Sequence, residues 1–310
     1  MSTVARLTDK AIAHPPRWLP TNTQYETLMG SVAYGVSSDT SDMDIYGFCI
    51  PHKDDVFPHL RGEIPGFGHQ HQRFEQYQEH HLQDPDALAG HGRTYDIQIF
   101  SIVKYFDLLM QNNPNIIDSL FTPINCVLHC TTIGNMVREN RKKFLHKGSW
   151  FKFKGYAYSQ LHKIATKNPP VGKRKEIVDK FGYDTKFAYH VVRLLTEVEQ
   201  IMLEGDINLQ QNNEQLKSIR RGEWTEPQIK SWAEAKEKEL EVLYVNSKIQ
   251  HKPDEPFIRQ LLLNCLEQHY GSLDQCIVNP DAATVAINQI ADILVKFQKR
   301  GSYESLSNAS

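Results

Sequence analysis

Apolar residues in the first 125 positions recur in two patterns, one typical of strands and the other of helices. Alternating or short continuous apolar runs predict strands at Asp44–Ile50, Phe74–His80 and Tyr95–Ser101. Apolar residues at helical spacing predict helices at Ile102–Met110 and Asn115–Phe121, separated by Asn113-Pro114. Thr21–Leu28 fits either the end of a helix or the entry to a strand. The first part of the chain is therefore expected to mix strands and helices.

After residue 125 the apolar spacing is almost entirely helical. Gly155 and Gly205 interrupt it, and Pro169-Pro170 marks an exposed loop. Helices are expected at Ile133–Phe144, Phe151–Thr166, Lys186–Leu203, Pro227–Val245, Pro256–Tyr270 and Ala282–Lys299. The sequence thus predicts an α+β fold: an N-terminal core with a mixed β-sheet at residues 1–125, followed by a helical domain at residues 126–310.

The residues best suited to chemistry lie just before the first of these strands. Asp42 and Asp44 are two residues apart, so on an extended strand both carboxylates point to the same side. Two such carboxylates suit Mg²⁺, which keeps water and phosphate oxygens as its other ligands. Upstream, Gly30 allows a close approach of the backbone to a triphosphate and Ser31 adds a hydroxyl donor. Ser41 can brace the turn that presents the two aspartates.

An Asp-x-Asp pair alone is common on surface turns, so the combination matters more than either part. Here a Gly-Ser pair is followed, after ten residues, by the acidic pair and an apolar strand. In this arrangement the sequence resembles the DNA polymerase beta superfamily of nucleotidyltransferases. The resemblance implies a catalytic core at residues 1–125 and a site for Mg²⁺, with Mn²⁺ as an alternative, together with an NTP substrate. The implied NTP contacts in this region are Gly30, Ser31, Tyr34 and Ser41.

That superfamily usually carries a third catalytic carboxylate on a neighbouring strand. Asp96 is our choice, because it opens the alternating strand about fifty residues downstream. It would serve as a third metal ligand or as the base for the incoming hydroxyl. The alternative interpretation is an ordinary carboxylate at the start of a strand, and the competing candidates are Asp54, Asp55 and Glu75.

Further motifs narrow the resemblance over roughly residues 25–245. They are Asn113-Pro114-Asn115, Gly155-Tyr156 with Gln160, and Gly182-Tyr183-Asp184-Thr185-Lys186 with His190 and Arg193. Together they resemble the predicted nucleotidyltransferases of bacteria and phages, some of which are encoded beside RNA ligases and proposed to act in RNA repair. The resemblance implies an RNA acceptor, such as tRNA or RNA ends.

Three polar residues share one face of the helix expected at Lys186–Leu203. Lys186, His190 and Arg193 fall within about 60° on a helical wheel, opposite an apolar stripe. Periodicity alone favours a solvated face with an Arg193–Glu197 pair. The family resemblance instead implies that the three side chains line a cleft between the two domains and contact the triphosphate.

One segment departs from the weak net charge of −2. Residues 138–180 hold thirteen Lys and Arg against three Asp and Glu, an excess of +10. The aromatic residues interleaved with them are Phe144, Trp150, Phe151, Phe153, Tyr156 and Tyr158. Such a segment can bind single-stranded nucleic acid, although half or more of these aromatics can equally belong to the helix core.

Other features of composition restrict the class of protein further. The five cysteines are scattered with no C-x-x-C pair, which indicates reduced thiols in a cytoplasmic protein. No apolar run is long enough to cross a membrane. The histidines of the stretch 69–91 (His69, His71, His80, His81 and His91) match no standard zinc spacing, so a flexible polar loop is expected there.

The predicted reaction is transfer of a nucleoside monophosphate from an NTP to an acceptor hydroxyl, with release of pyrophosphate. Two alternatives remain open at this level. One is AMP transfer to a protein or a small molecule, and the other is a domain that binds nucleotide or RNA without catalysis. The intact acidic pair at Asp42 and Asp44 argues against the non-catalytic alternative.

Overall fold

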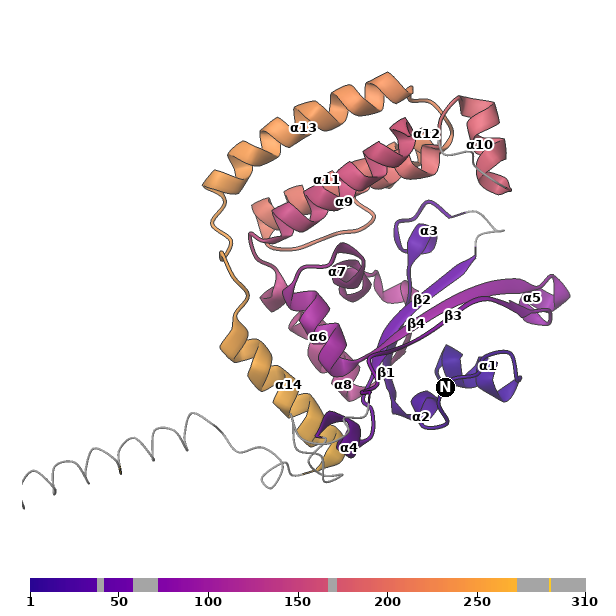
Figure 1. The fold of residues 1–310 in the computed structure, drawn as a ribbon, viewed down its shortest axis with the longest axis vertical. Helices are drawn as coiled ribbons and strands as arrows, with labels where there is room; N and C mark the ends of the chain where they lie inside the picture. Colours follow the sequence, from indigo (N-terminus) through magenta and orange to yellow (C-terminus); the bar gives the residue numbers. More distant parts are fainter. Residues whose placement is uncertain (38–41, 58–71, 167–171, 272–289, 291–310) are drawn as a thin grey trace, which may run out of the picture. The chain divides into compact units, whose positions relative to one another are not determined.

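The computed structural model describes residues 1–37, 42–57, 72–166, 172–271 and 290. In this part of the chain five strands form one sheet in the order β3-β4-β2-β1-β5 (Figure 1). The strands are β1 Thr23–Leu28, β2 Met43–Cys49, β3 Gln76–Asp84, β4 Arg93–Ser101 and β5 Val127–Cys130. Strands β2 and β4 run parallel, while the other neighbours are antiparallel. The sheet is therefore mixed, as the sequence predicts.

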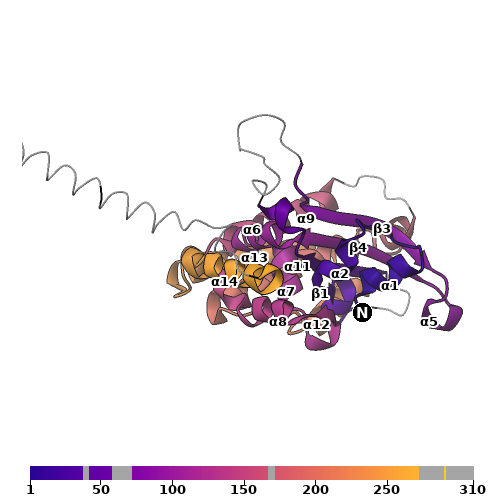
Figure 2. The ribbon, with the colours of Figure 1, turned by 90° about the horizontal axis from the view of Figure 1, so that it is seen from below.

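Alternation along the strands gives the sheet two different faces. Ile45, Cys49, Ile97 and Ile99 point to one face, where they pack against α1 (Thr3–Asp9) and α2 (Leu19–Asn22) in a buried apolar cluster. Figure 2, seen from below, shows both helices against this face. Because this face is filled by apolar side chains, the acidic residues of β2 and β4 must belong to the other one.

The opposite face carries α6 (Ile102–Met110), α7 (Pro114–Phe121) and α8 (Thr132–Glu139). The side chain of Ser101 caps α6 by accepting a hydrogen bond from the amide of Lys104 at 3.2 Å. Tyr25, Phe48 and Tyr105 stack in a row beneath these helices, with ring centroids 5.0–6.0 Å apart. Three short helical turns lie at the edges: α3 Gly30–Ala33, α4 Lys53–Val56 and α5 Ala87–Gly90.

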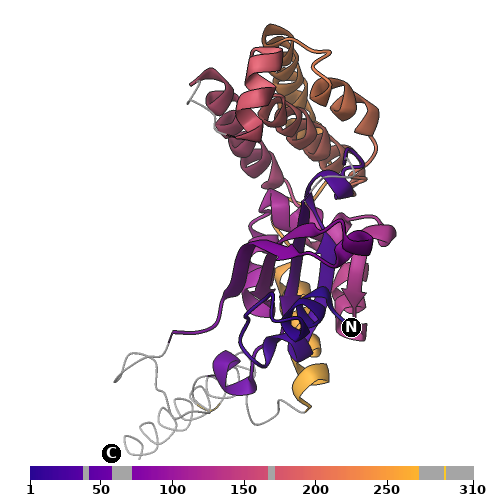
Figure 3. The ribbon, with the colours of Figure 1, turned by 90° about the vertical axis from the view of Figure 1, so that its right-hand side faces the viewer.

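A group of helices, which we call the helical lobe, lies over the end of the sheet at which β2 begins (Figures 1 and 3). It consists of α9 Ser149–Ala165, α10 Lys173–Phe181, α11 Thr185–Glu204, α12 Asn213–Arg220 and α13 Glu226–Asn246. Helix α11 is the centre of the lobe and is buried on nearly every side. Helix α14 (Glu255–Tyr270) returns along α8, where Cys265 Sγ lies 3.8 Å from Met136 Sδ.

Most of the expected elements are present with boundaries shifted by a few residues. Helix α6 has the expected bounds, while the helix expected at Ile133–Phe144 is divided into α8 and a 3-10 turn at Arg141–Phe144. The patterns did not predict α1, α10, α12 or β5. The helix expected at Ala282–Lys299 lies outside the described residues, apart from Ile290.

The chain divides into a unit at residues 1–269 and a second unit at 270–310, of which only Tyr270, Gly271 and Ile290 are described. Strand β5 pairs with β1, so the sheet continues just beyond the expected boundary at residue 125. The division into a catalytic core and a helical domain there stays a prediction. No helix in the described ranges is long and apolar enough to cross a membrane.

Candidate active site

The Gly30-Ser31 turn lies directly against the acidic strand. Strand β1 ends at Leu28, and the amide of Met29 donates to the carbonyl of Asp44 at 2.7 Å. Gly30 follows with φ +62°, a left-handed conformation that favours glycine. A Cβ built at Gly30 would collide with the Asp44 carboxylate. Gly30 is therefore needed twice, for its backbone conformation and for the space that the carboxylate occupies.

The pairing of β2 with β4 brings the two candidate carboxylates together. Asp44 and Asp96 are Cα partners across the parallel pair. Neighbouring strands lie about 4.8 Å apart, and paired residues of parallel strands point to the same face. Asp44 and Asp96 therefore lie side by side on the face that the helical lobe overhangs. The competitors Asp54 and Asp55 are on α4, and Glu75 precedes β3, so none of these shares this register position.

The electrostatic environment of Asp44 shows that these carboxylates interact. Burial raises the pKa of Asp44, and the negative charges of Asp96 and Asp42 raise it further. Lys186, on α11, opposes this shift. Asp42 itself is exposed immediately before β2. Asp44 is thus close enough to Asp96 and Asp42 for their negative charges to repel it. Lys186 of the helical lobe is close enough to attract it.

This donor set fits a divalent cation. Oxygen ligands from adjacent carboxylates are those that Mg²⁺ prefers, and their mutual repulsion would be relieved by a bound cation. Within the described ranges, however, no three Asp, Glu, His or Cys side chains converge closely enough to hold a metal ion by themselves. Phosphate oxygens would have to complete the coordination, as is usual for Mg²⁺ in phosphoryl-transfer sites.

Two histidines from the His-rich stretch lie beside Asp96. The amide of His81 donates to Asp96 Oδ1 at 2.7 Å, and His80 Nδ1 lies 3.5 Å from the same oxygen. Both residues belong to β3, so the strand predicted at Phe74–His80 is confirmed at His80, and the expectation of a flexible polar loop is wrong for both residues. The reason is that pairing with β4 orders this polar segment. His91 follows α5, while His69 and His71 lie outside the described residues.

The helical lobe forms the wall opposite the carboxylates. Burial is the main cause that raises the pKa of Tyr46 to about 12. Electrostatic interactions with Asp44 and with Tyr156, which is on α9, contribute to this rise. Lys186 is exposed at the start of α11. Half-buried His190 lies one turn further along, and its pKa is held well below the usual range by burial and by nearby cations. His190 is therefore neutral at pH 7, and it would contact a phosphate as a hydrogen-bond donor and not as a cation.

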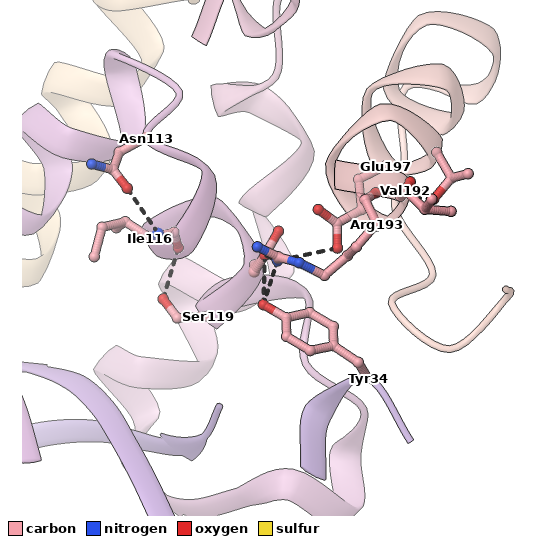
Figure 4. A network of polar contacts seen from close by, with 9 residues as sticks. Tyr34, Asn113, Ile116, Ser119, Val192, Arg193 and Glu197 are labelled. Atoms are coloured by element: carbon pink, nitrogen blue, oxygen red, sulfur yellow. Dashed lines mark hydrogen bonds and ion pairs between the residues drawn. The ribbon is translucent and has the colours of Figure 1, made fainter. Parts of the chain in front are cut away.

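Arg193 does not share the open surface of Lys186. Its side chain is only 2% exposed and donates to Asp118 on α7 and to the Tyr34 hydroxyl, while Glu197 lies 3.4 Å away (Figure 4). The expected Arg193–Glu197 pair is therefore present, but it is buried and not solvated. The expectation of a single open face formed by Lys186, His190 and Arg193 is wrong at Arg193, because α7 and α3 cover that turn of α11.

Tyr34 belongs to the same buried network. Its hydroxyl donates to Asp118 Oδ2 at 2.8 Å, and the Arg193 guanidinium stacks 4.3 Å from the centre of its ring. Burial raises the pKa of both Asp118 and Glu197. Tyr34 directly follows α3, so the network ties the Gly30-Ser31 turn to α7 and α11. Tyr34 is thus buried beside the Gly30-Ser31 turn, while Ser31 is half-buried within it.

Several residues around the site were not singled out from the sequence. Arg174 on α10 and Arg220 on α12 add to the cationic environment of His190. Tyr46 shares the strand face with Asp44, and this follows from the i, i+2 spacing once β2 is recognised. Arg174 lies in the basic segment at residues 138–180, but no local pattern shows that it or Arg220 lies near His190. Ser41 lies outside the described residues.

The basic aromatic segment at residues 138–180 divides between core and surface. Phe144, Trp150 and Phe153 are buried, as expected for about half of its aromatics. Tyr158 donates to Glu237 at 2.5 Å on the side of α9 that faces α13, whereas Tyr156 points toward the acidic strand. Some of the positive charge is also neutralised, as in the Lys142–Asp206 pair at 2.5 Å.

A model of the family described as the RNA repair pathway DNA polymerase beta family, RlaP, matches residues 9–275. The chain is also similar to a solved nucleotidyltransferase-like protein from Exiguobacterium sibiricum 255-15, with 9% identity, 95% of this chain and 91% of that chain covered, and a TM-score of 0.27. That likeness is too loose to carry an argument. No curated protein matches the chain.

Proposed function

The chain belongs to the RNA repair pathway DNA polymerase beta family and is a nucleotidyltransferase of the polymerase beta type, and we propose that it transfers a nucleoside monophosphate from an NTP to a hydroxyl group of RNA with the help of Mg²⁺. The observation that carries this proposal is the register of β2 and β4, which sets Asp44 beside Asp96. Gly30 lies against Asp44, and Lys186 interacts electrostatically with the same carboxylate. Acidic ligands, a turn for the triphosphate and a cation therefore surround one position.

The carboxylates of Asp44 and Asp96 would hold the metal, with Asp42 joining them from the end of the preceding segment. A bound divalent cation would polarise the α-phosphate and neutralise the charge that develops on it. Mn²⁺ is a reasonable substitute in such a site, because carboxylate and phosphate oxygens also suit that ion.

The chain's own residues would guide the transfer as follows. The acceptor hydroxyl oxygen forms a bond to the α-phosphorus, and the bond from that phosphorus to the oxygen bridging to the β-phosphate breaks. Asp96 takes the hydroxyl proton, and pyrophosphate leaves with the bridging oxygen. Lys186 and the neutral imidazole of His190 would stabilise the leaving pyrophosphate, Lys186 by charge and His190 by a hydrogen bond. The product carries the nucleotide on its former hydroxyl.

Arg193 and Tyr34 would act by positioning and not by touching the triphosphate. Both side chains are buried, and Arg193 already contacts Asp118. Through Tyr34 this network holds the turn that carries Gly30 and Ser31 at a fixed place relative to α11. We therefore assign direct NTP contacts to Gly30, Ser31, Lys186 and His190, and a supporting role to Tyr34 and Arg193. The contact predicted for Ser41 lies outside the described residues.

The acceptor would lie along one face of α9. Lys152, Tyr156, Ser159 and Lys163 fall within about 60° on this helix, from its first turns to its last. Tyr156 marks where this face passes the acidic strand. Neither lysine makes an ion pair within the described residues, although Lys163 lies 5.5 Å from the ring of Phe187. Cations flanking a half-buried aromatic suit a single-stranded nucleic acid.

Gly155 supports this assignment. Glycine in a helix interior costs about 0.5–1 kcal/mol relative to alanine. Gly155 has a negative φ, and a Cβ added there would meet no atom within 4 Å. Neither backbone conformation nor packing within the described part of the protein therefore requires a glycine. The open space beside Tyr156 leaves room for a polynucleotide backbone to approach the helix closely.

A cytoplasmic location is part of the same proposal. Cys49, Cys126, Cys130 and Cys265 are all free thiols, as expected in a reducing compartment. The fifth cysteine, Cys276, lies outside the described residues.

The proposal is tested by incubating the protein with each α-labelled NTP, Mg²⁺ and either total RNA or total protein. We expect label in RNA with at least one NTP. Asp42→Asn and Asp44→Asn should each reduce this labelling by about 10³-fold or more, because each removes a charged ligand worth several kcal/mol. Asp9→Asn, an exposed aspartate on α1 at the opposite face of the sheet, is the matched control and should label normally. Label only in protein would make AMP transfer to a protein the function.

A further inference from the structure

Strand β3 contains an irregularity directly opposite Asp96. Glu79 pairs with Ile97 and Leu82 pairs with Tyr95, so two residues, His80 and His81, face the single residue Asp96. This arrangement is a β-bulge. His81 adopts φ +57°, a left-handed backbone conformation that residues other than glycine adopt uncommonly. Bulges are common beside active sites, where they change the direction of a side chain or an amide.

The contacts of this bulge converge on one oxygen of Asp96. The His81 amide donates to Oδ1 at 2.7 Å, and the ring Nδ1 atoms of His80 and His81 lie 3.5 Å and 3.8 Å from the same atom. No hydrogen bond or ion pair among the described residues involves Oδ2 of Asp96. The bulge therefore leaves the second oxygen free for other ligands.

A short chain of side chains fixes the orientation of the His80 ring. Gln76 Nε2 donates to Gln78 Oε1 at 3.4 Å, which orients the Gln78 amide so that its nitrogen meets His80 Nε2 at 2.6 Å. Since an amide nitrogen can only donate, His80 Nε2 must accept. The proton of the neutral ring then resides on Nδ1, the ring nitrogen that lies 3.5 Å from Asp96 Oδ1.

Packing does not explain the bulge. The side chains of His80 and His81 are 51% and 83% exposed. A regular two-stranded ladder would need one residue fewer and no positive φ. His80 also influences the electrostatic environment of Asp44, so it lies near both carboxylates of the proposed site.

We propose that the His80–His81 bulge positions Asp96 for catalysis. It would engage Oδ1 through the His81 amide and the His80 Nδ1–H, and so present Oδ2 to the cation and to the acceptor hydroxyl. Residues that hold a metal ligand in place commonly affect activity without touching the metal. This inference rests on the proposed function, because it concerns the orientation of the third carboxylate of that site.

The test compares three substitutions of His80 in the full chain. His80→Ala should lower kcat for RNA labelling by about 10–100-fold, while the KM for NTP changes less than about twofold. His80→Asn should stay within about threefold of wild type, because its amide nitrogen is as many bonds from Cβ as Nδ1. His80→Gln, whose amide nitrogen corresponds to Nε2, should resemble His80→Ala. His91→Ala, an exposed histidine after α5, is the matched control.

A second readout separates positioning from direct ligation. Mn²⁺ affinity in the presence of a non-hydrolysable NTP, measured by electron paramagnetic resonance, should stay within about twofold of wild type in His80→Ala. A fall in Mn²⁺ affinity parallel to the fall in kcat would make His80 a metal ligand and overturn the proposal. Wild-type kcat in His80→Ala, or equal losses in His80→Ala and His80→Asn, would also overturn it. If wild-type protein labelled nothing, the proposed function itself would fail.

Discussion

Two clusters of carboxylates lie a short distance apart in this protein, and their surroundings differ in almost every respect. Asp118 and Glu197 are fully buried and share the guanidinium of Arg193. Asp44 and Asp96 lie on strands at the margin of the helical lobe, partly open to solvent. The first cluster contains its own cation, whereas Lys186 lies near the second and, in the described part of the chain, makes no ion pair with either carboxylate.

The difference distinguishes a cluster that stabilises the fold from one that we propose to be catalytic. A buried carboxylate is tolerated when a cation neutralises it, because the cost of removing its charge from water is then offset. Neighbouring carboxylates without such a partner repel one another, and the raised pKa of Asp44 records that repulsion together with burial. A protein keeps such an arrangement where a metal ion or a substrate is to be bound.

Removing Arg193 should damage the first cluster severely. Arg193→Met would leave Asp118 and Glu197 buried without a cation, so the free energy of unfolding should fall by about 3–5 kcal/mol, measured by urea denaturation. Arg221→Met removes an exposed pair with Glu223 and should leave the free energy of unfolding almost unchanged, because solvent screens that pair. A stable Arg193→Met protein with weakened NTP binding would instead make Arg193 a direct nucleotide ligand.

Lys186 lies two turns before Arg193 on the same helix. Its removal should weaken NTP binding and leave the stability of the fold almost unchanged. Lys186→Ala should raise the KM for NTP about tenfold and change stability by less than about 0.5 kcal/mol, since the side chain is exposed. The loss should be larger at low salt than at high salt. Lys175→Ala, an exposed lysine on α10, is the control. Equal KM values for the two variants would show that Lys186 does not contact the NTP and is an ordinary solvent-exposed residue.

The second cluster should also affect how the stability of the ligand-free protein depends on pH. The folded pKa of Asp44 is raised above its unfolded value, so the folded state loses stability as pH rises through that pKa. Asp44→Asn removes this loss and should stabilise the protein by about 1 kcal/mol at pH 7. The gain should disappear in acid, where wild-type Asp44 is protonated. A destabilising effect of Asp44→Asn at pH 7, measured by thermal unfolding, would contradict the unpaired state of this carboxylate.

The sequence predicted the acidic pair because its features are local. The i, i+2 spacing of Asp42 and Asp44 and the apolar run after them are visible in a few residues. The choice of Asp96 depended on family resemblance, since nothing local shows that β4 pairs in parallel with β2 at that register. Likewise β5 has only four residues and carries little periodicity of its own, so it was missed.

The burial of Arg193 could not be predicted from a helical wheel. A wheel assumes that the polar side of a helix meets solvent, but α11 is surrounded by other elements on nearly every side. Arg193 is accommodated there only because Asp118, 75 positions earlier, lies on the facing helix. The alternation at Phe74–His80 predicts a strand there, but no local pattern shows that it pairs with β4 or that His80 and His81 form a bulge opposite Asp96.

The most direct measurement is a crystal structure with Mn²⁺ and a non-hydrolysable NTP, using anomalous scattering to locate the metal. We expect a peak bound by the carboxylates of both Asp44 and Asp96, with metal–oxygen distances of about 2.0–2.3 Å, and with the triphosphate against Gly30 and Lys186. A metal peak elsewhere, or Asp96 more than about 8 Å from the carboxylate of Asp44, would contradict the site, since two-metal sites span only about 4 Å.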